Sequence, residues 1–307
     1  MGTFLVDRLL RLLVVVFGAT LVAFVLLRLA GDPASVLLGI FATPEQREAL
    51  RAELNLDDPL PLQFVAYVGQ VLQGDLGESW KFREPATDVV FERFPATLEL
   101  VGLGIGTALI VGLLLGVLTA TRAGRALDGA LMTFSLVARA VPTFWLGTLL
   151  ILLFAVELNW LPTSGKAGAS SYVMPVVTIA LFYVAEFAMV VRASMIEALA
   201  SDYVRAATAK GLPRRLVLVR HALRNSLNPI LSVVGVSFGA LLGGTVIVEA
   251  VFSWPGVGLL AVQSVTQTDY PVLQAIVLLI ALTVALVTMV TDILYGVLDP
   301  RIRKARA

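Results

Sequence analysis

Residues 201–229 read SDYVRAATAKGLPRRLVLVRHALRNSLNP and decide how the rest of the chain is organised. The stretch lies between two apolar runs that are each long enough to cross a membrane. Its first half, residues 203–212, has the composition of a helix, and Pro213 interrupts or restarts that helix because proline cannot donate a backbone hydrogen bond. A single acid, Asp202, accompanies six basic residues, which are Arg205, Lys210, Arg214, Arg215, Arg220 and Arg224.

This basic segment has two interpretations, and composition alone favours neither. It is either a solvated loop that its charge holds on the cytoplasmic side, or a short helix that docks a soluble partner. Small residues remove side-chain bulk and would let the backbone of another protein come close; they stand at Ala206, Ala207, Ala209 and Gly211.

The overall composition is that of a protein with several membrane spans. Of the 307 residues, 58% are hydrophobic and 15% are charged, whereas a soluble domain carries roughly 25% charged residues. The chain has no cysteine, which excludes disulfides, a Cys-based metal site and a thiol nucleophile. Its one histidine, His221, cannot form a His-rich metal site, so we expect neither catalytic residues nor a bound metal.

Six apolar runs can each cross the hydrocarbon core, which needs about 20 helical residues. Helix is the expected form because lipid offers no partner for unpaired backbone groups. The first run is longer than the roughly 7–15 apolar residues of a signal-peptide core, and no small-residue cleavage pattern follows it, so we expect a retained span. The predicted fold is all-α, with six transmembrane helices at about residues 9–29, 97–120, 127–156, 173–191, 227–248 and 272–297.

The distribution of Lys and Arg sets the expected orientation. Fifteen of the 23 lie in one alternating set of segments, which includes residues 201–229 and 301–307, and seven lie in the opposite set. Six of those seven lie in or beside the long segment 31–96, where the positive-inside rule weakens. We therefore expect both termini in the cytoplasm.

The outer segment 31–96 is too long for a plain connector between spans. Thr43, Pro44 and Gln46 are typical of a helix start, with Thr43 as the cap and Gln46 as its capping-box partner. A second helix is expected at about residues 60–73. We expect a lid that either packs on the membrane surface or forms part of a platform for an external delivery protein.

A second outer segment, residues 249–271, carries no Lys or Arg and is too apolar for an ordinary loop. Irregular backbone survives near lipid only where protein or a water-filled cavity surrounds it, so a re-entrant or surface-lying hairpin is expected. The chain then divides into a first helix with its cytoplasmic end (1–30), the lid (31–96), a five-helix core (97–300) with an inner helix at about 201–215, and a cytoplasmic tail (301–307).

Several motifs resemble the permease subunits of ABC importers in the dipeptide/oligopeptide/nickel family. RAATAKG, residues 205–211, resembles the loop in which those permeases contact their ATPase through Glu-Ala-Ala, three residues and Gly. In this branch Arg commonly replaces the Glu after Asp-Tyr-Val, as Arg205 does here. The matching motifs cover nearly the whole chain, at residues 31–33 (GDP), 74–77 (GDLG), 93–98 (RFPATL), 220–223 (RHAL), 251–258 (VFSWPGVG), 292–295 (DILY) and 298–301 (LDPR).

The resemblance implies the type I fold of ABC importer permeases, in the plasma membrane of a bacterium or archaeon. It also implies a homologous second permease, two ATP-binding subunits or one fused pair, and an extracytoplasmic solute-binding protein, with no nucleic acid partner. ATP and Mg belong to the partner ATPases in such a system, and no cofactor is expected on this chain. The residues implied in ATPase coupling are Asp202, Tyr203, Arg205, Ala206, Ala207, Lys210, Gly211 and Leu212.

Four residues inside the predicted spans are candidates for the translocation path. Arg139 and Glu186 are ionisable groups within spans, which usually face protein or water, and they would attract the two charged ends of a peptide. A mutual ion pair, or snorkelling toward an interface, is the simpler alternative. Met189 stands where the family commonly has Arg, so the resemblance assigns Glu186 no role. Gly239 and Gly243 either line the path or permit close helix packing.

We expect the permease subunit of an ATP-driven importer that forms half of a path for peptides; nickel or metal chelates and glutathione-like compounds are alternative solutes. An ATP-independent secondary carrier or channel is the alternative of another class, but we see no convincing repeat and it would leave the basic segment unexplained. A membrane enzyme would need a nucleophile–base pair, metal cluster or cofactor motif. The Gly-rich stretches 102–106 and 239–244 lack the Lys and Ser/Thr of a phosphate-binding loop and favour close packing.

Overall fold

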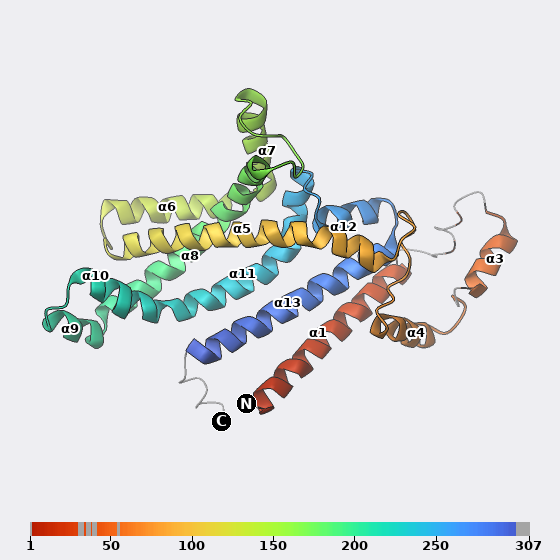
Figure 1. Cartoon of the computed structure of the whole chain (residues 1–307), viewed down its shortest axis with the longest axis horizontal. Coiled ribbons are helices and arrows are strands. Elements are labelled where there is room, and N and C mark those ends of the chain that lie inside the picture. Colours follow the sequence, from red (N-terminus) through yellow and green to blue (C-terminus); the bar gives the residue numbers. More distant parts are fainter. Residues whose placement is uncertain (1, 30–33, 35–37, 39–41, 54–55, 299–307) are drawn as a thin grey trace. The chain divides into compact units, whose positions relative to one another are not determined.

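The computed structural model describes residues 2–29, 34, 38, 42–53 and 56–298, and this part of the chain is mostly helical. The only β feature among these residues is an isolated bridge between Glu78 and Pro85. The predicted all-α fold is confirmed (Figure 1). The GDP motif at residues 31–33 and the tail at 301–307 lie outside the described residues.

The helices form two compact units, and two long helices take part in both. The first unit comprises residues 1–95 and 256–286, and it contains α1 (Gly2–Leu29), α3 (Pro44–Glu53), α4 (Leu60–Leu72), the start of α5 (Ala86–Ala120), α12 (Val257–Thr266) and much of α13 (Tyr270–Leu298). The second unit comprises residues 96–255 and 287–307, and it adds α6 (Ala126–Ala140), α7 (Thr143–Leu150), η1 (Ile151–Glu157), η2 (Ala169–Tyr172), α8 (Val173–Ala200), α9 (Asp202–Ala209), α10 (Arg214–Leu216), η3 (Val217–Leu223) and α11 (Arg224–Val251).

Four described helices are long and apolar enough to cross a membrane, and a bent pair can form a fifth span. The four are Ala86–Ala120, Ala169–Ala200, Pro229–Val251 and Tyr270–Ile293. Helix α1 is 28 residues long, and its apolar stretch runs from Leu10 to Val25. The structure thus supports four or five spans by length and composition, and the predicted count of six stays a prediction.

The third predicted span, over residues 127–156, is not one continuous helix but is bent at Pro142. The helices Asp128–Ala140 and Thr143–Glu157 meet at an angle of 96°. Val141 is extended, with φ −77° and ψ 120°, because the residue before a proline avoids the helical region. Figure 1 shows α7 turning away from α6 at this point.

The second predicted span also begins earlier than expected, at Ala86 rather than at residue 97. Val89 and Val90, in the first turns of this helix, are buried. They pack against Val257 and Leu260 of α12 and other apolar residues of the first unit. Pro95 lies inside this helix. Apolar packing therefore extends the helix through Pro95, which the sequence had placed in the loop before the span.

The connection that leads into α5 is fastened by one buried carboxylate. Asp269 is 1% exposed and accepts a hydrogen bond from the Ser79 hydroxyl at 2.5 Å. The backbone N–H groups of Trp80 and Lys81 donate to the same carboxylate at 3.2 and 3.3 Å. The ring of Trp80 meets that of Tyr270 edge-on, with centroids 5.5 Å apart. These contacts hold the loop after the GDLG motif to the turn before α13.

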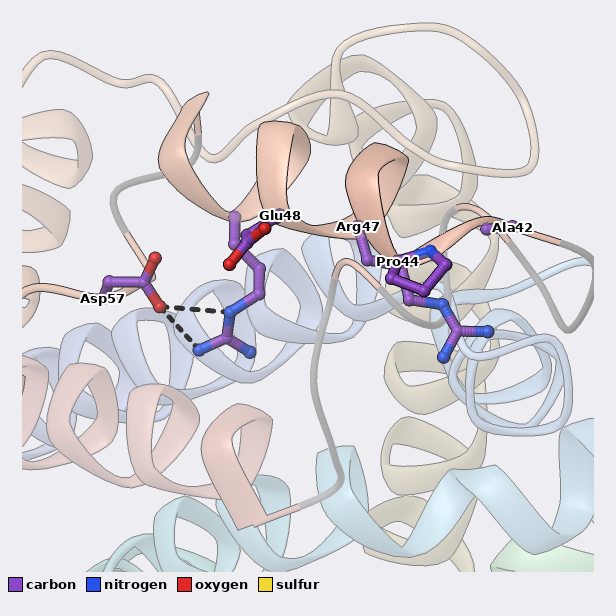
Figure 2. A pocket seen from close by; sticks show the side chains of 6 residues that line it. Ala42, Pro44, Arg47, Glu48 and Asp57 are labelled. Carbon is purple, nitrogen blue, oxygen red and sulfur yellow. Dashed lines mark hydrogen bonds and ion pairs between the residues drawn. The ribbon is translucent and has the colours of Figure 1, made fainter.

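The outer segment contains both predicted helices, and the predicted capping box is confirmed. The N–H of Thr43 donates to Gln46 Oε1 at 3.0 Å, and the N–H of Gln46 donates to Thr43 Oγ1 at 3.3 Å. Arg51, in the last turn of α3, donates from Nε and Nη2 to Asp57 Oδ1 at 3.1 and 2.8 Å (Figure 2). These residues and Ala42, Pro44, Arg47 and Glu48 line an open surface hollow.

Helix α4 packs on α1 through aromatic rings. The ring of Phe64 meets Phe17 and Phe24 edge-on, with centroids 5.7 and 5.3 Å apart. Gln63 is buried on the same helix and donates to the carbonyl groups of Leu56 and Asp58. The helix predicted at 60–73 is therefore tied both to α1 and to the chain that precedes it.

Glycines let α5 and α8 approach closely in the second unit. A Cβ on Gly116 would lie 2.5 Å from Val191 Cβ and 2.8 Å from the carbonyl oxygen of Ala188, which no side chain tolerates. A Cβ on Gly104 would lie 2.5 Å from Ile179 Cγ2, so the packing interpretation of this glycine is confirmed.

Candidate functional site

Helix α9 places its two buried residues on one face. Val204 and Ala207 are three residues apart and therefore share a face of the helix, where both are buried. They form a small cluster with Val217 of η3, against which Leu199 and Leu212 pack. The short helix is thus anchored at its base to the end of α8 and to the segment that leads into α11. Figure 1 shows α9 and α10 where α8 ends and α11 begins.

The opposite face of α9 is exposed and mixes charge with small residues. Asp202, Tyr203, Arg205, Ala206 and Lys210 are all exposed. Arg205 Nη2 lies 2.8 Å from Asp202 Oδ1, one turn earlier on the helix. Exposed pairs of this kind contribute little to stability, because water competes for both charges. The pair therefore leaves both charged groups on a surface that is accessible to solvent.

A glycine-based Schellman motif ends α9. The N–H of Gly211 donates to the carbonyl of Thr208 at 2.9 Å, and the N–H of Leu212 donates to that of Ala207 at 3.4 Å. Gly211 has φ +75°, and a Cβ added to it would meet nothing within 4 Å. Its positive φ therefore explains the glycine without any appeal to the close approach of a partner. The side chain of Leu212 turns back to the cluster beneath the helix.

A π-helix connects this site to α11. Val217–Leu223 forms η3, in which Val217 and Ala222 are buried and Arg220 is exposed. Such wide turns are uncommon and occur frequently at functional sites. Sequence reasoning did not find this element, because no side-chain pattern distinguishes a π-helix from an α-helix.

The candidate path residues Arg139 and Glu186 do not pair with each other. Arg139 lies in the last turn of α6, and its guanidinium carbon is 5.5 Å from the ring centroid of Phe182. This geometry is a cation–π contact, whose favourable electrostatics offset part of the cost of placing an arginine in a span. Glu186 is half-buried on α8 next to Tyr183. The alternative of an Arg139–Glu186 ion pair is not what the structure shows.

The glycines of α11 fall into two groups. A Cβ on Gly235 would lie 2.5 Å from Thr291 Cγ2, so this glycine permits close packing on α13. Gly243 and Gly244 are exposed, with nothing within 4 Å of an added Cβ, and Gly239 is half-buried. The part of α11 that contains Gly243 and Gly244 therefore has no neighbour packed against these glycines in this chain.

An ion pair that sequence reasoning missed lies between α6 and α8. Arg192 donates from Nε to Asp128 Oδ1 at 2.6 Å and from Nη2 to Asp128 Oδ2 at 2.8 Å. The N–H of Gly124 donates to the same carboxylate at 2.9 Å. The partners are 64 residues apart, so no local spacing could have revealed the pair.

A second missed cluster joins α5 to the loop before α8. Lys166 Nζ lies 2.6 Å from Glu99 Oε2, and the Tyr172 hydroxyl donates to the same oxygen at 2.6 Å. The hydrogen bond to Glu99 raises the pKa of Lys166, so the amine stays charged. Trp254 packs edge-on against Tyr172 and donates from Nε1 to the carbonyl of Ala96 at 2.9 Å.

The second unit also contains a buried carboxylate, that of Glu249. The Thr97 hydroxyl donates to Glu249 Oε1 at 2.7 Å, and both residues are fully buried. Within the described part of the chain, no group of three or more His, Cys, Asp or Glu residues could hold a metal ion.

The sequence matches two families of known transport proteins. Residues 112–304 match the family described as the binding-protein-dependent transport system inner membrane component, and residues 1–101 match the N-terminal family of such membrane components. The glutathione transport system permease protein GsiC of Escherichia coli O6:H1 is 40% identical over 304 residues, which cover 99% of each chain. A probable peptide ABC transporter permease protein, y4tP of Sinorhizobium fredii, is 38% identical over 312 residues, 99% of this chain and 100% of the relative.

Two solved structures share the fold. An inward-facing structure of the MetNI methionine ABC transporter matches with a TM-score of 0.56 and 18% identity over 69% of this chain and 96% of the other. A crystal structure of an amino acid ABC transporter with histidines matches with a TM-score of 0.51 and 20% identity over 70% of this chain and 94% of the other. The helical fold, its apolar spans and these full-length relatives agree: the chain belongs to the family of inner membrane components of binding-protein-dependent transport systems, as a multi-pass permease subunit of an ABC importer.

Proposed function

We propose that this permease couples to its ATPases through the exposed face of α9. The observation that carries the proposal is the split of this helix into an anchored face, Val204 and Ala207, and an accessible face that carries Tyr203, Arg205 and Ala206. A partner that binds the exposed face can displace α9, and the packing of the buried face transmits this displacement to α8 and η3. Asp202, Lys210 and Gly211 are also exposed and are proposed for the same contact. Leu212 is proposed for coupling as well, but through its packing beneath α9.

The motion follows from how α9 is connected. Ser201 alone separates it from α8, while α10 and η3 connect it to α11. When ATP closes the nucleotide-binding pair, α9 moves and displaces the ends of both long helices. A cavity between two permeases then opens outward, and hydrolysis resets it inward. ATP and Mg are bound by the partner subunits in this scheme, and this chain binds no cofactor.

We infer that the solute is a short peptide and that glutathione, itself a tripeptide, belongs to the accepted class. Support comes from the two full-length relatives, one named for glutathione and one for peptides. Arg139 and Glu186, which do not neutralise each other, are kept as candidate path residues for the charged ends of a peptide, together with Gly239 and Gly243. Nickel and metal chelates have no comparable support.

The assembly we propose contains a homologous second permease, two ATPase subunits or a fused pair, and an extracytoplasmic solute-binding protein. In this arrangement α9 and both termini lie in the cytoplasm, in agreement with the excess of Lys and Arg in the segments around them. The segment 31–96 lies outside, where it can meet the binding protein.

The test is purification of the complex in mild detergent, followed by reconstitution with the binding protein and assays of ATP hydrolysis and of uptake of labelled glutathione and a labelled dipeptide. The variant Arg205→Glu should retain assembly and lose uptake by about 10-fold or more, as expected when a central interface contact worth about 2 kcal/mol is removed. Arg122→Glu reverses an exposed charge outside α9 and is the matched control.

Three results would each contradict one part of the proposal. Normal uptake by Arg205→Glu in a complete complex would remove α9 from the coupling surface. Uptake by the purified chain without ATP or an ATPase would replace the importer scheme with a carrier. Uptake of neither probe by an otherwise ATP-dependent complex would reject the peptide class alone.

A further inference from the structure

The Asp128–Arg192 pair joins α8, which supports the coupling site, to α6, which leads into the bent span. Its two hydrogen bonds are parallel, which is the geometry that fixes the direction of both side chains. The side chain of Asp128 is 6% exposed and that of Arg192 is 24% exposed, so water competes weakly for the pair. A buried pair of this kind is poor evidence for added stability, since the loss of hydration offsets the attraction between the charges. A role in holding a particular arrangement of helices is the better explanation.

Asp128 also fixes the turn between α5 and α6. Its second oxygen accepts the N–H of Gly124, which has φ +77° in that turn. The same oxygen accepts Nη2 of Arg192. One carboxylate thus holds the start of α6 both to the preceding turn and to the side of α8.

Arg192 lies on the helix that supports the coupling site. Helix α8 continues without a break to Ala200, about 12 Å beyond Arg192 at the helical rise. Its residue Leu199 packs under α9. A displacement of α9 therefore reaches Arg192 through a single rigid element.

Asp128 lies at the start of the bent span. Helix α6 leads from Asp128 to the 96° bend at Val141 and Pro142, where Arg139 lies one turn before the break. We propose that Asp128 and Arg192 are positioning residues that lock α6 to α8, so that α6 and its bend follow α8 when α9 is displaced. This inference rests on the proposed coupling role of α9. It goes further because it names α6 as the helix that moves with α8, and the Asp128–Arg192 ion pair as the contact that couples the two helices.

The experiment measures the lock directly and needs no transported solute. The chain has no cysteine, so paired spin labels can be introduced at Leu136 of α6 and Ala200 of α8, both exposed. In the assembled complex the distance between the labels should be the same without nucleotide and with bound ATP. In Asp128→Asn, which keeps the side-chain shape and removes the charge, the distance distribution should broaden and shift on ATP binding. Glu197→Gln removes an exposed charge from α8 close to Arg192 and should behave as the unmodified chain.

Coupling supplies the second readout. Glutathione taken up per ATP hydrolysed should fall about 2- to 30-fold in Asp128→Asn, the range that changes along a coupling network produce. Arg192→Lys keeps the charge but cannot form the parallel bonds, and an intermediate ratio is expected. A variant that merely lost folded complex would lower hydrolysis and uptake together and leave their ratio unchanged.

Three outcomes overturn the lock. They are an ATP-dependent change of the label distance in the unmodified complex, an unaltered distance distribution in Asp128→Asn, and an unaltered coupling ratio in that variant. Failure of the proposed role of α9 is recognised separately, because Arg205→Glu would then leave coupling intact whatever the labels report.

Discussion

At the residue scale, Gly211 shows how one backbone angle decides a residue type. Its φ of +75° lies in the left-handed region, where a side chain costs about 1 kcal/mol. We predict that Gly211→Ala lowers the thermal stability of the complex or loosens the end of α9, and weakens coupling without any steric block. Hydrogen exchange of the amides of Gly211 and Leu212 would report the loosened cap.

Two matched variants separate backbone strain from bulk. Gly129→Ala, in α6 where nothing lies within 4 Å of the added methyl, should be neutral or slightly stabilising. Ala206→Leu adds bulk to the exposed face of α9 without any strain, and should reduce coupling if a partner packs closely there. Full coupling in Ala206→Leu together with loss in Gly211→Ala would leave the cap geometry as the sole requirement.

Lys166 gives a prediction with a definite pH dependence. Lys166→Met should destabilise the second unit by about 1 kcal/mol or less, as for partly exposed ion pairs. Because the hydrogen bond to Glu99 raises the pKa of Lys166, the stabilising charge is present throughout the neutral and mildly alkaline range. It is lost only as the pH rises through the raised value, above the ordinary lysine pKa of about 10.4.

The measurement is thermal unfolding followed by intrinsic tryptophan fluorescence, to which Trp254 contributes from its position against Tyr172 in this cluster. The difference between Lys166→Met and the unmodified protein should stay constant from about pH 7 to 9. A difference that disappears across this range would show that the Lys166 charge is not what stabilises the cluster.

At the element scale, the bend between α6 and α7 has a local cause that can be removed. Pro142 has no N–H, and its ring forces Val141 into an extended conformation. Pro142→Ala should permit a straighter helix and lengthen the distance between spin labels at Leu136 and Leu152. The two sites are 16 residues apart and would be separated by about 24 Å in a continuous helix.

An unchanged label distance in Pro142→Ala would mean that tertiary packing imposes the bend. The chain offers a reason for that result, since Gly147 of α7 lies against Phe252, where an added Cβ would be 3.1 Å from the ring. Gly147→Ala is the comparison variant, because it disturbs this contact and leaves Pro142 in place.

The elements could be predicted because their causes are local, whereas most pairings could not. A long apolar run becomes a helix wherever it lies, since lipid leaves its backbone no other partner. Thr43 and Gln46 form their capping box three residues apart for the same local reason. The bond between Thr97 and Glu249 spans 152 residues and depends on the finished fold. Arg139 and Glu186 were left with several alternatives by the sequence, and the contact of Arg139 with the ring of Phe182 also depends on the finished fold.

At the scale of the whole molecule, the family and the subunit role are established, and four or five of the described helices are long and apolar enough to cross a membrane. Whether the number of crossings is even or odd determines if the two termini lie on the same side of the membrane. An even number of crossings leaves both ends of the chain on one side, and an odd number separates them. The charge distribution predicts an even number, because Arg8 and Arg11 near one end and the basic residues of 301–307 at the other belong to the same side.

Single cysteines test this parity without background, because the chain contains none. Thr3→Cys and Ala305→Cys should both resist a membrane-impermeant maleimide in cells whose outer membrane has been opened and whose inner membrane is intact. Both should react once the inner membrane is permeabilised. Thr208→Cys on α9 should behave in the same way, whereas Gly168→Cys, in the loop that leads to η2, should react in intact cells. Labelling of Thr3→Cys alone among the two terminal variants would mean that α1 and the five other predicted spans do not all cross, and that the chain crosses the membrane an odd number of times. Labelling of Thr208→Cys from outside would invert the whole arrangement and place α9 beyond the reach of any ATPase.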